Sequence, residues 1–249
     1  MVGVTSSMRG EGKSLSSINI AYSLAQAGHR VLMVEGDMRL PSLAYKMRLP
    51  QKKGLSDLVS TNMNLADLIQ TFEMTEKQSD KVETKVRFDL LVAGTIPPNP
   101  SELLGSQKMQ ALFEELKQSY DYVILDLPPV IAVSDALVAS PLLDGMIFVV
   151  RHDYSEKGAI MEAMRQMDFA GAHVLGFVFN CVSEAKDGYI GRYRYRYGKK
   201  YYRGSYYRYG YSRSSYGYGE PHSHLQQENN GNGTQQEVEL KNTEQAEKK

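Results

Sequence analysis

A short segment near the N-terminus has the residue types and spacing of a loop that binds phosphate. Residues 7–14 read Ser-Met-Arg-Gly-Glu-Gly-Lys-Ser and depart from the P-loop pattern only by the serine at the first glycine position. Gly10 and Gly12 allow backbone N–H groups to turn toward phosphate oxygens, where a side chain would obstruct them. Lys13 supplies a positive charge to the β- and γ-phosphates, and Ser14 offers a hydroxyl to Mg²⁺. The alternative interpretation is a glycine-rich turn that leads into a helix. The residues expected to contact the nucleotide are Ser7, Arg9, Gly10, Glu11, Gly12, Lys13, Ser14 and Leu15.

Acidic residues follow two apolar segments that have the character of buried strands. Val31–Glu35 ends in an acid and is followed by Gly36 and Asp37, and Tyr122–Asp126 ends in a second acid. In an open parallel sheet, ligands bind outside the carboxyl ends of the strands, so these acids are expected to converge near the phosphate loop. A helix cap for Asp37 and a turn acid for Asp126 are the alternatives.

This convergence predicts a division of roles for phosphoryl transfer from ATP with Mg²⁺. Arg39 and Arg151 are either partners of these acids or surface cations. The expected metal ligands are Ser14, Asp37 and Asp126, and the expected catalytic residues are Lys13, Glu35, Asp37 and Asp126.

Short apolar segments alternate with stretches of helical periodicity over roughly residues 1–183. Near-continuous apolar strands separated by helices are typical of a parallel sheet that is buried on both faces. We therefore predict an α/β fold of the P-loop NTPase type, with a mainly parallel central sheet flanked by helices. The expected strands are Met1–Thr5, Val31–Glu35, Phe88–Ala93, Tyr122–Asp126, Met146–Arg151 and His173–Asn180, and the clearest helices are Ser14–Ala27, Ser106–Gln118 and Gly158–Phe169.

The overall composition excludes several classes of protein. The 249 residues carry 29 basic and 29 acidic side chains, which argues against a generally basic nucleic-acid binder. The single cysteine, Cys181, excludes an internal disulfide framework and cysteine-rich zinc sites. No apolar run reaches the length of about 18 residues that a membrane span needs. We expect a cytoplasmic chain.

The composition changes after residue 183. Residues 189–218 contain twelve tyrosines and eight basic residues, with almost no aliphatic side chains. Such a segment cannot bury a core, so a disordered tail is predicted. The expected organisation is an ATP-binding domain over 1–183, a Tyr/Arg-rich tail over 184–219 and a polar disordered tail over 220–249.

Several motifs together resemble those of the bacterial tyrosine kinases, which act in capsular and extracellular polysaccharide export and are related to MinD/ParA-type ATPases. Residues 5–14 are similar to the family's phosphate loop, and residues 35–39 and 125–130 to its second and third acidic motifs. Residues 93–104 resemble this family more closely than its relatives. Gly176–Asn180 resembles a late strand whose asparagine lies near the adenine, which adds Asn180 to the cofactor-binding residues.

The resemblance implies an ATP-dependent protein-tyrosine kinase that autophosphorylates its C-terminal tyrosines and regulates capsule or exopolysaccharide synthesis and export. In such a kinase Glu35, or Asp37 in its place, would orient or deprotonate the incoming phenol. It also implies a separate membrane adaptor of the polysaccharide co-polymerase type and a cognate phosphotyrosine phosphatase, and it makes a homo-oligomer one of the possible states. We expect recruitment to the inner face of the plasma membrane by a partner, and no specific nucleic acid. The expected phosphoacceptors are Tyr193, Tyr195, Tyr197, Tyr201, Tyr202, Tyr206, Tyr207, Tyr209, Tyr211, Tyr216 and Tyr218.

Two residues depart from the family pattern. Arg9 stands where the family usually has proline, and Glu35 stands where it usually has aspartate. The family normally carries an upstream Glu/Arg-rich helix that is used for ring-shaped self-association. We do not expect that helix here, so the oligomeric state stays open. The alternative function is a MinD/ParA-like ATPase switch without kinase activity, although Met8 occupies the position of that branch's signature lysine. Further alternatives are a tail that binds RNA, anionic lipid or polysaccharide, and a tail that only solubilises the chain.

Overall fold

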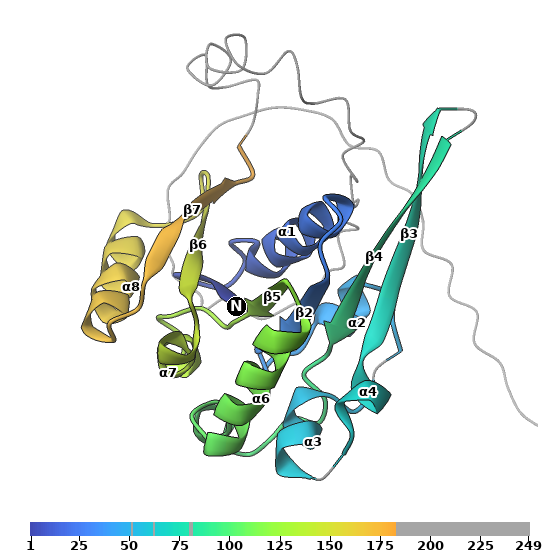
Figure 1. The fold of residues 1–249 in the computed structure, drawn as a ribbon. Helices are drawn as coiled ribbons and strands as arrows, with labels where there is room; N and C mark the ends of the chain where they lie inside the picture. Colours follow the sequence, from blue (N-terminus) through green and yellow to red (C-terminus); the bar gives the residue numbers. More distant parts are fainter. Residues whose placement is uncertain (51, 62, 80–81, 183–249) are drawn as a thin grey trace, which may run out of the picture. The chain divides into compact units, whose positions relative to one another are not determined.

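The computed structural model describes residues 1–50, 52–61, 63–79 and 82–182, and within these ranges seven strands form one sheet (Figure 1). The strand order is β3-β4-β2-β5-β1-β6-β7, so the strand that precedes the phosphate loop is interior to the sheet. The prediction of a mainly parallel sheet flanked by helices is confirmed, and the two predicted tail segments, 184–219 and 220–249, lie outside the described residues. The strands are β1 (Val2–Ser6), β2 (Val31–Glu35), β3 (Gln70–Ser79), β4 (Val82–Leu91), β5 (Tyr122–Asp126), β6 (Gly145–Arg151) and β7 (Val174–Asn180).

The antiparallel hairpin of β3 and β4 is the main feature that the sequence pattern did not predict. Only the end of β4 was expected as a strand, over Phe88–Ala93, whereas β4 begins at Val82 and pairs along its length with β3. Phe72 lies opposite Phe88, and their rings are 5.2 Å apart. Along β3 polar side chains such as Thr71 and Glu73 alternate with apolar ones, which is the pattern of an edge strand with one solvated face.

Helices cover both faces of the sheet. One apolar cluster joins the sheet to α1 and α2, through side chains such as Ala21 and Leu43. A second cluster joins the opposite face to α3–α8, through side chains such as Phe113 and Met167. The helices are α1 (Lys13–Gln26), α2 (Leu43–Lys46), α3 (Leu55–Ser60), α4 (Leu65–Leu68), α5 (Pro100–Leu104), α6 (Gln107–Ser119), α7 (Asp135–Ala139) with the following 3₁₀ turn Ser140–Leu142, and α8 (Lys157–Phe169).

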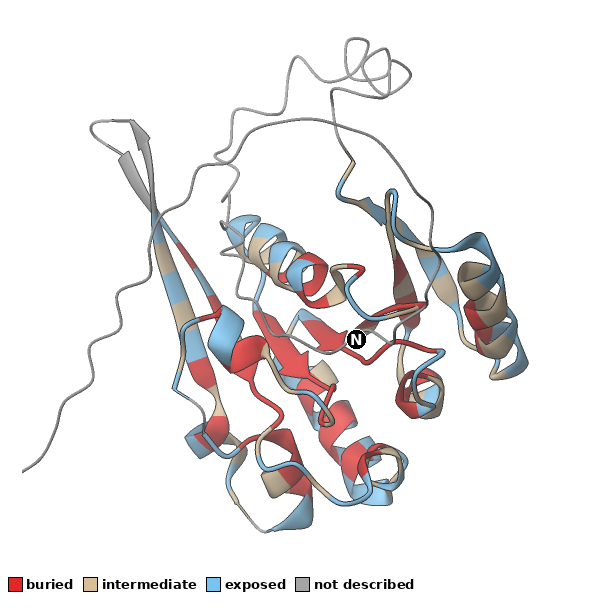
Figure 2. Ribbon diagram, turned by 180° about the vertical axis from the view of Figure 1, so that it is seen from behind, coloured by how far each residue is buried: buried red, intermediate tan, exposed pale blue. Residues whose placement is uncertain are grey.

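The central strands are the most deeply buried part of the described chain (Figure 2). Every residue of β2 is buried, because Leu32 and Val34 contact one helical layer while Val31 and Met33 contact the other. Burial on both faces explains why these segments read as continuous apolar runs rather than alternating ones. None of the helices within the described residues has the length and apolar character needed to span a bilayer.

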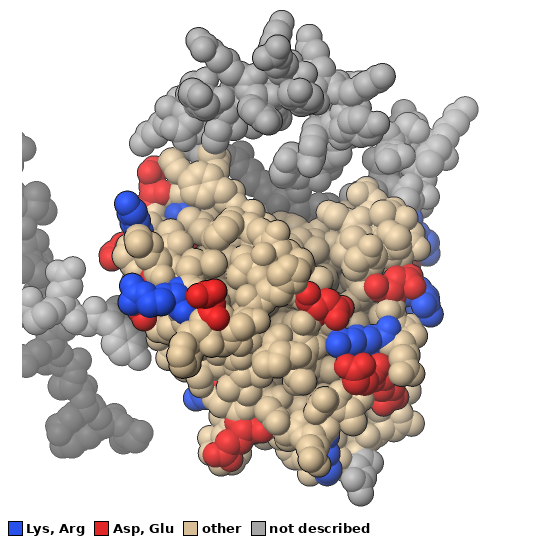
Figure 3. Space-filling model, turned by 60° about the vertical axis from the view of Figure 1, so that its left-hand side comes forward, with Lys and Arg blue, Asp and Glu red and all other residues tan. Residues whose placement is uncertain are grey.

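Charged side chains on the surface are interspersed rather than segregated by sign. On the face that Figure 3 shows, basic and acidic groups lie close to one another around broad uncharged areas. Among the described residues, Lys117 pairs with Glu114 at 3.0 Å and Arg165 pairs with Glu162 at 2.9 Å. Such exposed pairs contribute little to stability, so the apolar clusters hold the fold together.

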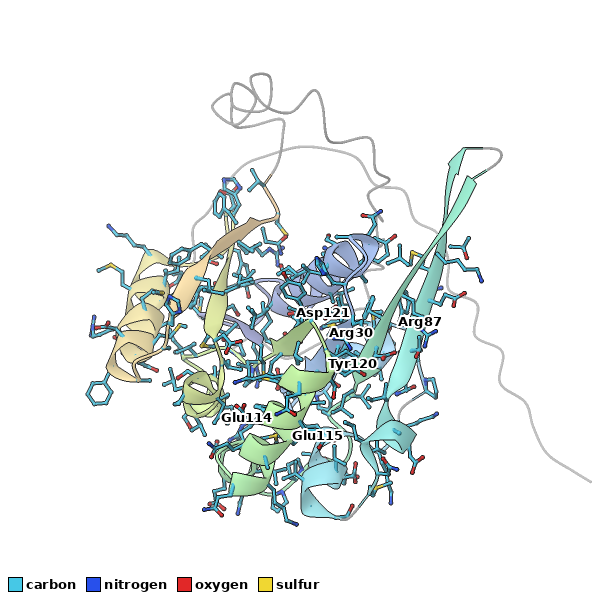
Figure 4. The ribbon with its side chains drawn as sticks, viewed as in Figure 1. Arg30, Arg87, Glu114, Glu115, Tyr120 and Asp121 are labelled. Atoms are coloured by element: carbon cyan, nitrogen blue, oxygen red, sulfur yellow. The ribbon has the colours of Figure 1, made fainter. Side chains whose placement is uncertain are left out.

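Polar side chains gather at the amino ends of β2 and β5 and on the neighbouring part of β4, on the edge of the sheet opposite the phosphate loop (Figure 4). The Arg30 guanidinium lies 2.8 Å from Asp121, and the Asp121 carboxylate also accepts a hydrogen bond from the Arg30 backbone N–H. The Tyr120 hydroxyl donates to Asp89 at 3.0 Å. Partial burial, followed by this carboxylate, raises the pKa of Tyr120 to about 12.

We expect Tyr120→Phe to lower the free energy of unfolding by about 1 kcal/mol near neutral pH, because it removes one hydrogen bond to a carboxylate. Folding raises the pKa of Tyr120 from 10.0 to about 12, so the neutral phenol stabilises the folded state below the lower value. This contribution is lost as pH rises through the upper value. Urea unfolding of both proteins should therefore show a difference that shrinks with rising pH over this range. A constant difference would contradict the role of the phenol, and exposed Tyr45→Phe serves as the control.

Candidate functional site

The phosphate loop connects the carboxyl end of β1 to α1 and requires glycine at two positions. Gly10 and Gly12 have φ values of 85° and 95°, in the left-handed region that favours glycine. A Cβ atom at Gly12 would lie 2.0 Å from Asn180 Nδ2, and one at Gly10 would lie 2.9 Å from the Tyr154 hydroxyl. Both positions therefore require glycine, because the backbone is left-handed there and no space is left for a Cβ atom. The loop leads directly into α1, so the positive end of a fourteen-residue helix faces this region.

The side chain of Glu11 stabilises the loop from inside. It is buried, and its carboxylate accepts hydrogen bonds from the Ser7 hydroxyl at 2.6 Å and from the Met8 N–H at 2.7 Å. The Ser155 hydroxyl, from the segment between β6 and α8, is a third donor. Glu11 and Ser7 are thus engaged with each other, and their contribution to a nucleotide would come through their backbone N–H groups.

Lys13 lies between two of the predicted carboxylates. Its ammonium is 3.0 Å from Asp37 Oδ2 and 3.7 Å from Asp126 Oδ1, and all three side chains are largely buried. Burial raises the pKa of Asp126, while the positive charge of Lys13 and a hydrogen bond with Ser14 oppose the rise. Lys13, Ser14, Asp37 and Asp126 are therefore brought together at the carboxyl ends of β1, β2 and β5.

Glu35 lies close in sequence to Asp37, but its carboxylate is bound to other parts of the backbone. One oxygen accepts hydrogen bonds from the N–H groups of Ser42 and Leu43, each at 2.6 Å, and the other accepts from Ala93 N–H at 3.0 Å. Burial raises the pKa of Glu35, and these three hydrogen bonds oppose the rise. Glu35 thus joins the start of α2 to the segment after β4.

Asp37 and Arg39 have different partners. The second Asp37 oxygen accepts from Leu40 N–H at 3.2 Å, so Asp37 both stabilises its own turn and pairs with Lys13. Arg39 donates to both oxygens of Asp135, at 2.9 and 3.0 Å, and Asp135 is fully buried. Arg39 is therefore the partner of an acid on α7, an arrangement that neither sequence interpretation included.

The remaining predicted nucleotide contacts lie around the outer side of the loop. Arg9 is exposed and Leu15 is partly exposed, at 39%. Asn180, at the end of β7, donates through Nδ2 to the Glu11 carbonyl at 3.0 Å. Its predicted place near the adenine stays a prediction. The eleven predicted phosphoacceptor tyrosines lie outside the described residues.

Sequence reasoning missed Lys46 as a cation near this site. Its ammonium donates to the Ser42 hydroxyl at 2.6 Å, which places it beside the start of α2. Although the residue is exposed overall, desolvation of its ammonium, together with the nearby charge of Lys13, lowers the pKa of Lys46. The carboxylates of Asp126, Glu35 and Asp37 act against this effect. Lys46 belongs to no motif, and the only local signal is its helical spacing of four residues from Ser42.

The residues present fit a phosphate with its divalent cation. The N–H groups of the loop are free of side-chain obstruction at Gly10 and Gly12, and one hydroxyl and two carboxylates surround Lys13. Within the described ranges, no cluster of three His, Cys, Asp or Glu side chains is arranged to hold a metal by itself. A cation held by Ser14, Asp37 and Asp126 would therefore need phosphate oxygens to complete its coordination.

Comparison with known proteins identifies the family. Residues 2–169 match the family model described as an AAA domain. CapB of Staphylococcus aureus is 36% identical over 197 residues, which cover 79% of this chain and 80% of CapB. The tyrosine-protein kinase CpsD of Streptococcus agalactiae is 34% identical over 74% of this chain and 75% of CpsD. The chain belongs to the bacterial tyrosine-protein kinases. In contrast, it spans only 26% of EpsB of Ralstonia solanacearum, with 33% identity over 210 residues.

Solved structures share the fold of this chain. The chimerical protein CapA2B2 superposes with a TM-score of 0.63 and 35% identity, covering 72% of this chain and 74% of the chimera. MinD of Pyrococcus horikoshii, complexed with Mg-ADP, has a TM-score of 0.54 at 22% identity, covers 72% of this chain and 68% of MinD, and shares the fold. The family that the sequence motifs predicted is confirmed.

Substitutions at the two acids after β2 should separate stability from nucleotide binding. Glu35→Gln leaves one acceptor oxygen for three backbone donors and turns an NH₂ group toward the other, so the free energy of unfolding should fall by about 1–3 kcal/mol. Asp37→Asn should destabilise the fold less, because Lys13 keeps Asp126 as a partner, but should weaken Mg·ADP binding more. Urea unfolding and ADP titration of both variants test this, and a reversed order in either measurement would contradict the assignment.

Proposed function

We propose that this chain transfers the γ-phosphoryl group of ATP to tyrosines of its own C-terminal segment, in the same or a neighbouring subunit. The observation that supports this most directly is the position of Lys13 between Asp37 and Asp126, at the mouth of the glycine loop. Membership of the tyrosine-kinase family and a segment with twelve tyrosines within residues 189–218 support the choice of acceptor.

The groups at the loop have different roles in the proposed phosphoryl transfer. When bound, Mg·ATP supplies the transferable phosphoryl group and a divalent positive charge. The N–H groups of residues 10–14 bind phosphate oxygens, and Lys13 neutralises charge that develops on the transferring group. Ser14, Asp37 and Asp126 hold the cation, directly or through water.

Asp37 is the carboxylate that we assign to the acceptor tyrosine. Both oxygens of Glu35 accept hydrogen bonds from the backbone, so Glu35 supports the site by fixing α2. Of the two acids that the sequence left open for this role, we therefore choose Asp37. A free phenol has a pKa of about 10, so its orientation and the nearby positive charge matter more than prior deprotonation. Tethering the acceptor raises its local concentration to roughly millimolar.

The proposal extends to partners and location. CapA2B2 is a chimerical protein whose structure resembles this chain, which supports a CapA-type partner acting as a separate membrane adaptor of the polysaccharide co-polymerase type. We further propose recruitment to the inner face of the plasma membrane, homo-oligomerisation, reversal by a phosphotyrosine phosphatase, and control of capsule or exopolysaccharide synthesis and export. Each phosphorylation adds about −1.5 to −2 charges, so several would reverse the positive charge of the tail.

The test is incubation of the full chain with Mg·ATP, with and without a candidate adaptor, followed by mass spectrometry. We expect phosphate on several tyrosines of residues 193–218, and loss of it in Lys13→Met because the counter-charge to the phosphates is removed. Lys108→Met is the matched control, since Lys108 is exposed on α6 against the opposite face of the sheet.

Mixing active with inactive protein distinguishes phosphoryl transfer within one chain from transfer between chains. Active protein combined with Lys13→Met protein should label the inactive chain if transfer runs between subunits. ATP hydrolysis with unlabelled tyrosines, both with and without the adaptor, would instead favour a MinD/ParA-like switch.

A further inference from the structure

The segment between β6 and α8, residues 152–156, lies against the outer side of the phosphate loop. Arg151, the last residue of β6, donates to the Gly10 carbonyl at 2.8 Å, and the Tyr154 hydroxyl donates to the Arg9 carbonyl at 2.9 Å. The Ser155 hydroxyl donates to the buried Glu11 carboxylate. Three consecutive residues of the loop are thus held by side chains that lie about 140 positions away in the sequence.

Tyr154 is the accessible member of this contact. Its side chain is 48% exposed, whereas Glu11 is buried and Arg151 is half-buried. The Arg151 guanidinium carbon lies 4.8 Å from the centre of the Tyr154 ring, within the range of a cation–π interaction. The phenol therefore lies between a loop that binds phosphate and an arginine that can pair with phosphate.

We propose that Tyr154 is an additional phosphoacceptor of this kinase, and that its phosphorylation weakens nucleotide binding by releasing the outer half of the phosphate loop. The inference rests on the proposed function, because it uses the same transfer reaction. The Tyr154 oxygen attacks the γ-phosphorus of ATP bound to another subunit and forms a new O–P bond. The bond from the γ-phosphorus to the bridging oxygen breaks, ADP leaves with its electron pair, and the phenolic proton passes to solvent or a nearby base.

Two changes at the loop follow from this modification. The phosphorylated oxygen has no proton to donate, so the hydrogen bond to the Arg9 carbonyl is lost and becomes a repulsion between two acceptors. The added charge of about −1.5 to −2 attracts Arg151, which then leaves the Gly10 carbonyl. An anion placed beside the loop also repels the phosphates of an incoming nucleotide, so phosphorylation acts as negative feedback.

Another exposed tyrosine provides a matched control. Tyr45 on α2 is 89% exposed, which is more than Tyr154, yet its hydroxyl has no hydrogen bond to the phosphate loop. If exposure alone governs labelling, Tyr45 should be modified at least as much as Tyr154. If the arginines beside the loop favour the phosphorylated form, Tyr154 should be modified more.

The first experiment measures labelling in the full chain. Trypsin cleaves after Arg151 and Lys157, and after Arg39 and Lys46, so residues 152–157 and 40–46 form separate peptides. After incubation of wild-type protein with ¹⁵N-labelled Lys13→Met protein and Mg·ATP, we expect phosphate on the heavy 152–157 peptide, which comes from the inactive chain, at a level well above that of the heavy 40–46 peptide. A labelled tail with an unlabelled 152–157 peptide would overturn this inference and leave the proposed function standing. The absence of phosphotyrosine anywhere would overturn both.

The second experiment measures the effect on the loop without using kinase activity. Titration with Mg·ADP should give an affinity for Tyr154→Phe within about threefold of wild type, because only one neutral hydrogen bond is lost. Tyr154→Glu, which adds a negative charge, should bind about tenfold more weakly or worse. Tyr45→Glu should bind as wild type does, and thermal unfolding shows that each variant is folded. Equal ADP affinities for Tyr154→Glu and Tyr154→Phe would overturn the proposed effect.

Discussion

The site depends on one electrostatic constraint, which is that buried carboxylates at adjacent strand ends need a compensating positive charge. Asp126 is almost fully buried at the end of β5, and Asp37 lies just beyond the end of β2. Lys13 contacts both of them from the first turn of α1. Removing one partner of a buried ion pair leaves an uncompensated charge, which is costly, so the loop, the helix and the two strand ends are coupled through this lysine.

A bound phosphate would pair with the same lysine, so the contacts of Lys13 can change when a nucleotide binds. A bound phosphate would compete with Asp37 for the ammonium, while a divalent cation would satisfy the carboxylates in its place. The charges of Lys13, Asp37 and Asp126 are therefore compensated both with and without the ligand. Lys46 adds a further positive charge within reach of the same acids.

Two other acids near the site are used as acceptors for backbone or hydroxyl donors rather than for ligands. Glu35 joins the start of α2 to the segment after β4, and Glu11 gathers donors from Ser7, Met8 and Ser155. The additional methylene that distinguishes Glu35 from an aspartate gives its carboxylate the reach to contact backbone on both sides. A site held on so many sides is pre-organised, which is what phosphoryl transfer demands of a protein.

The sequence by itself determined the parts of this protein that local chemistry specifies. Continuous apolar runs predicted β2 and β5 because strands buried on both faces have no polar side to display, and Gly10, Gly12, Lys13 and Ser14 predicted the phosphate loop. The carboxyl-end rule of parallel sheets then placed Asp126 near that loop. Only the tertiary structure decided which way each acid points. Glu35 and Asp37 are two residues apart, yet Glu35 contacts the backbone at the start of α2 and after β4, whereas Asp37 contacts Lys13. The contacts of Arg151, Tyr154 and Asn180 with the loop also depend on the order β1-β6-β7 in the sheet, because hydrogen bonds over such sequence distances leave no local pattern.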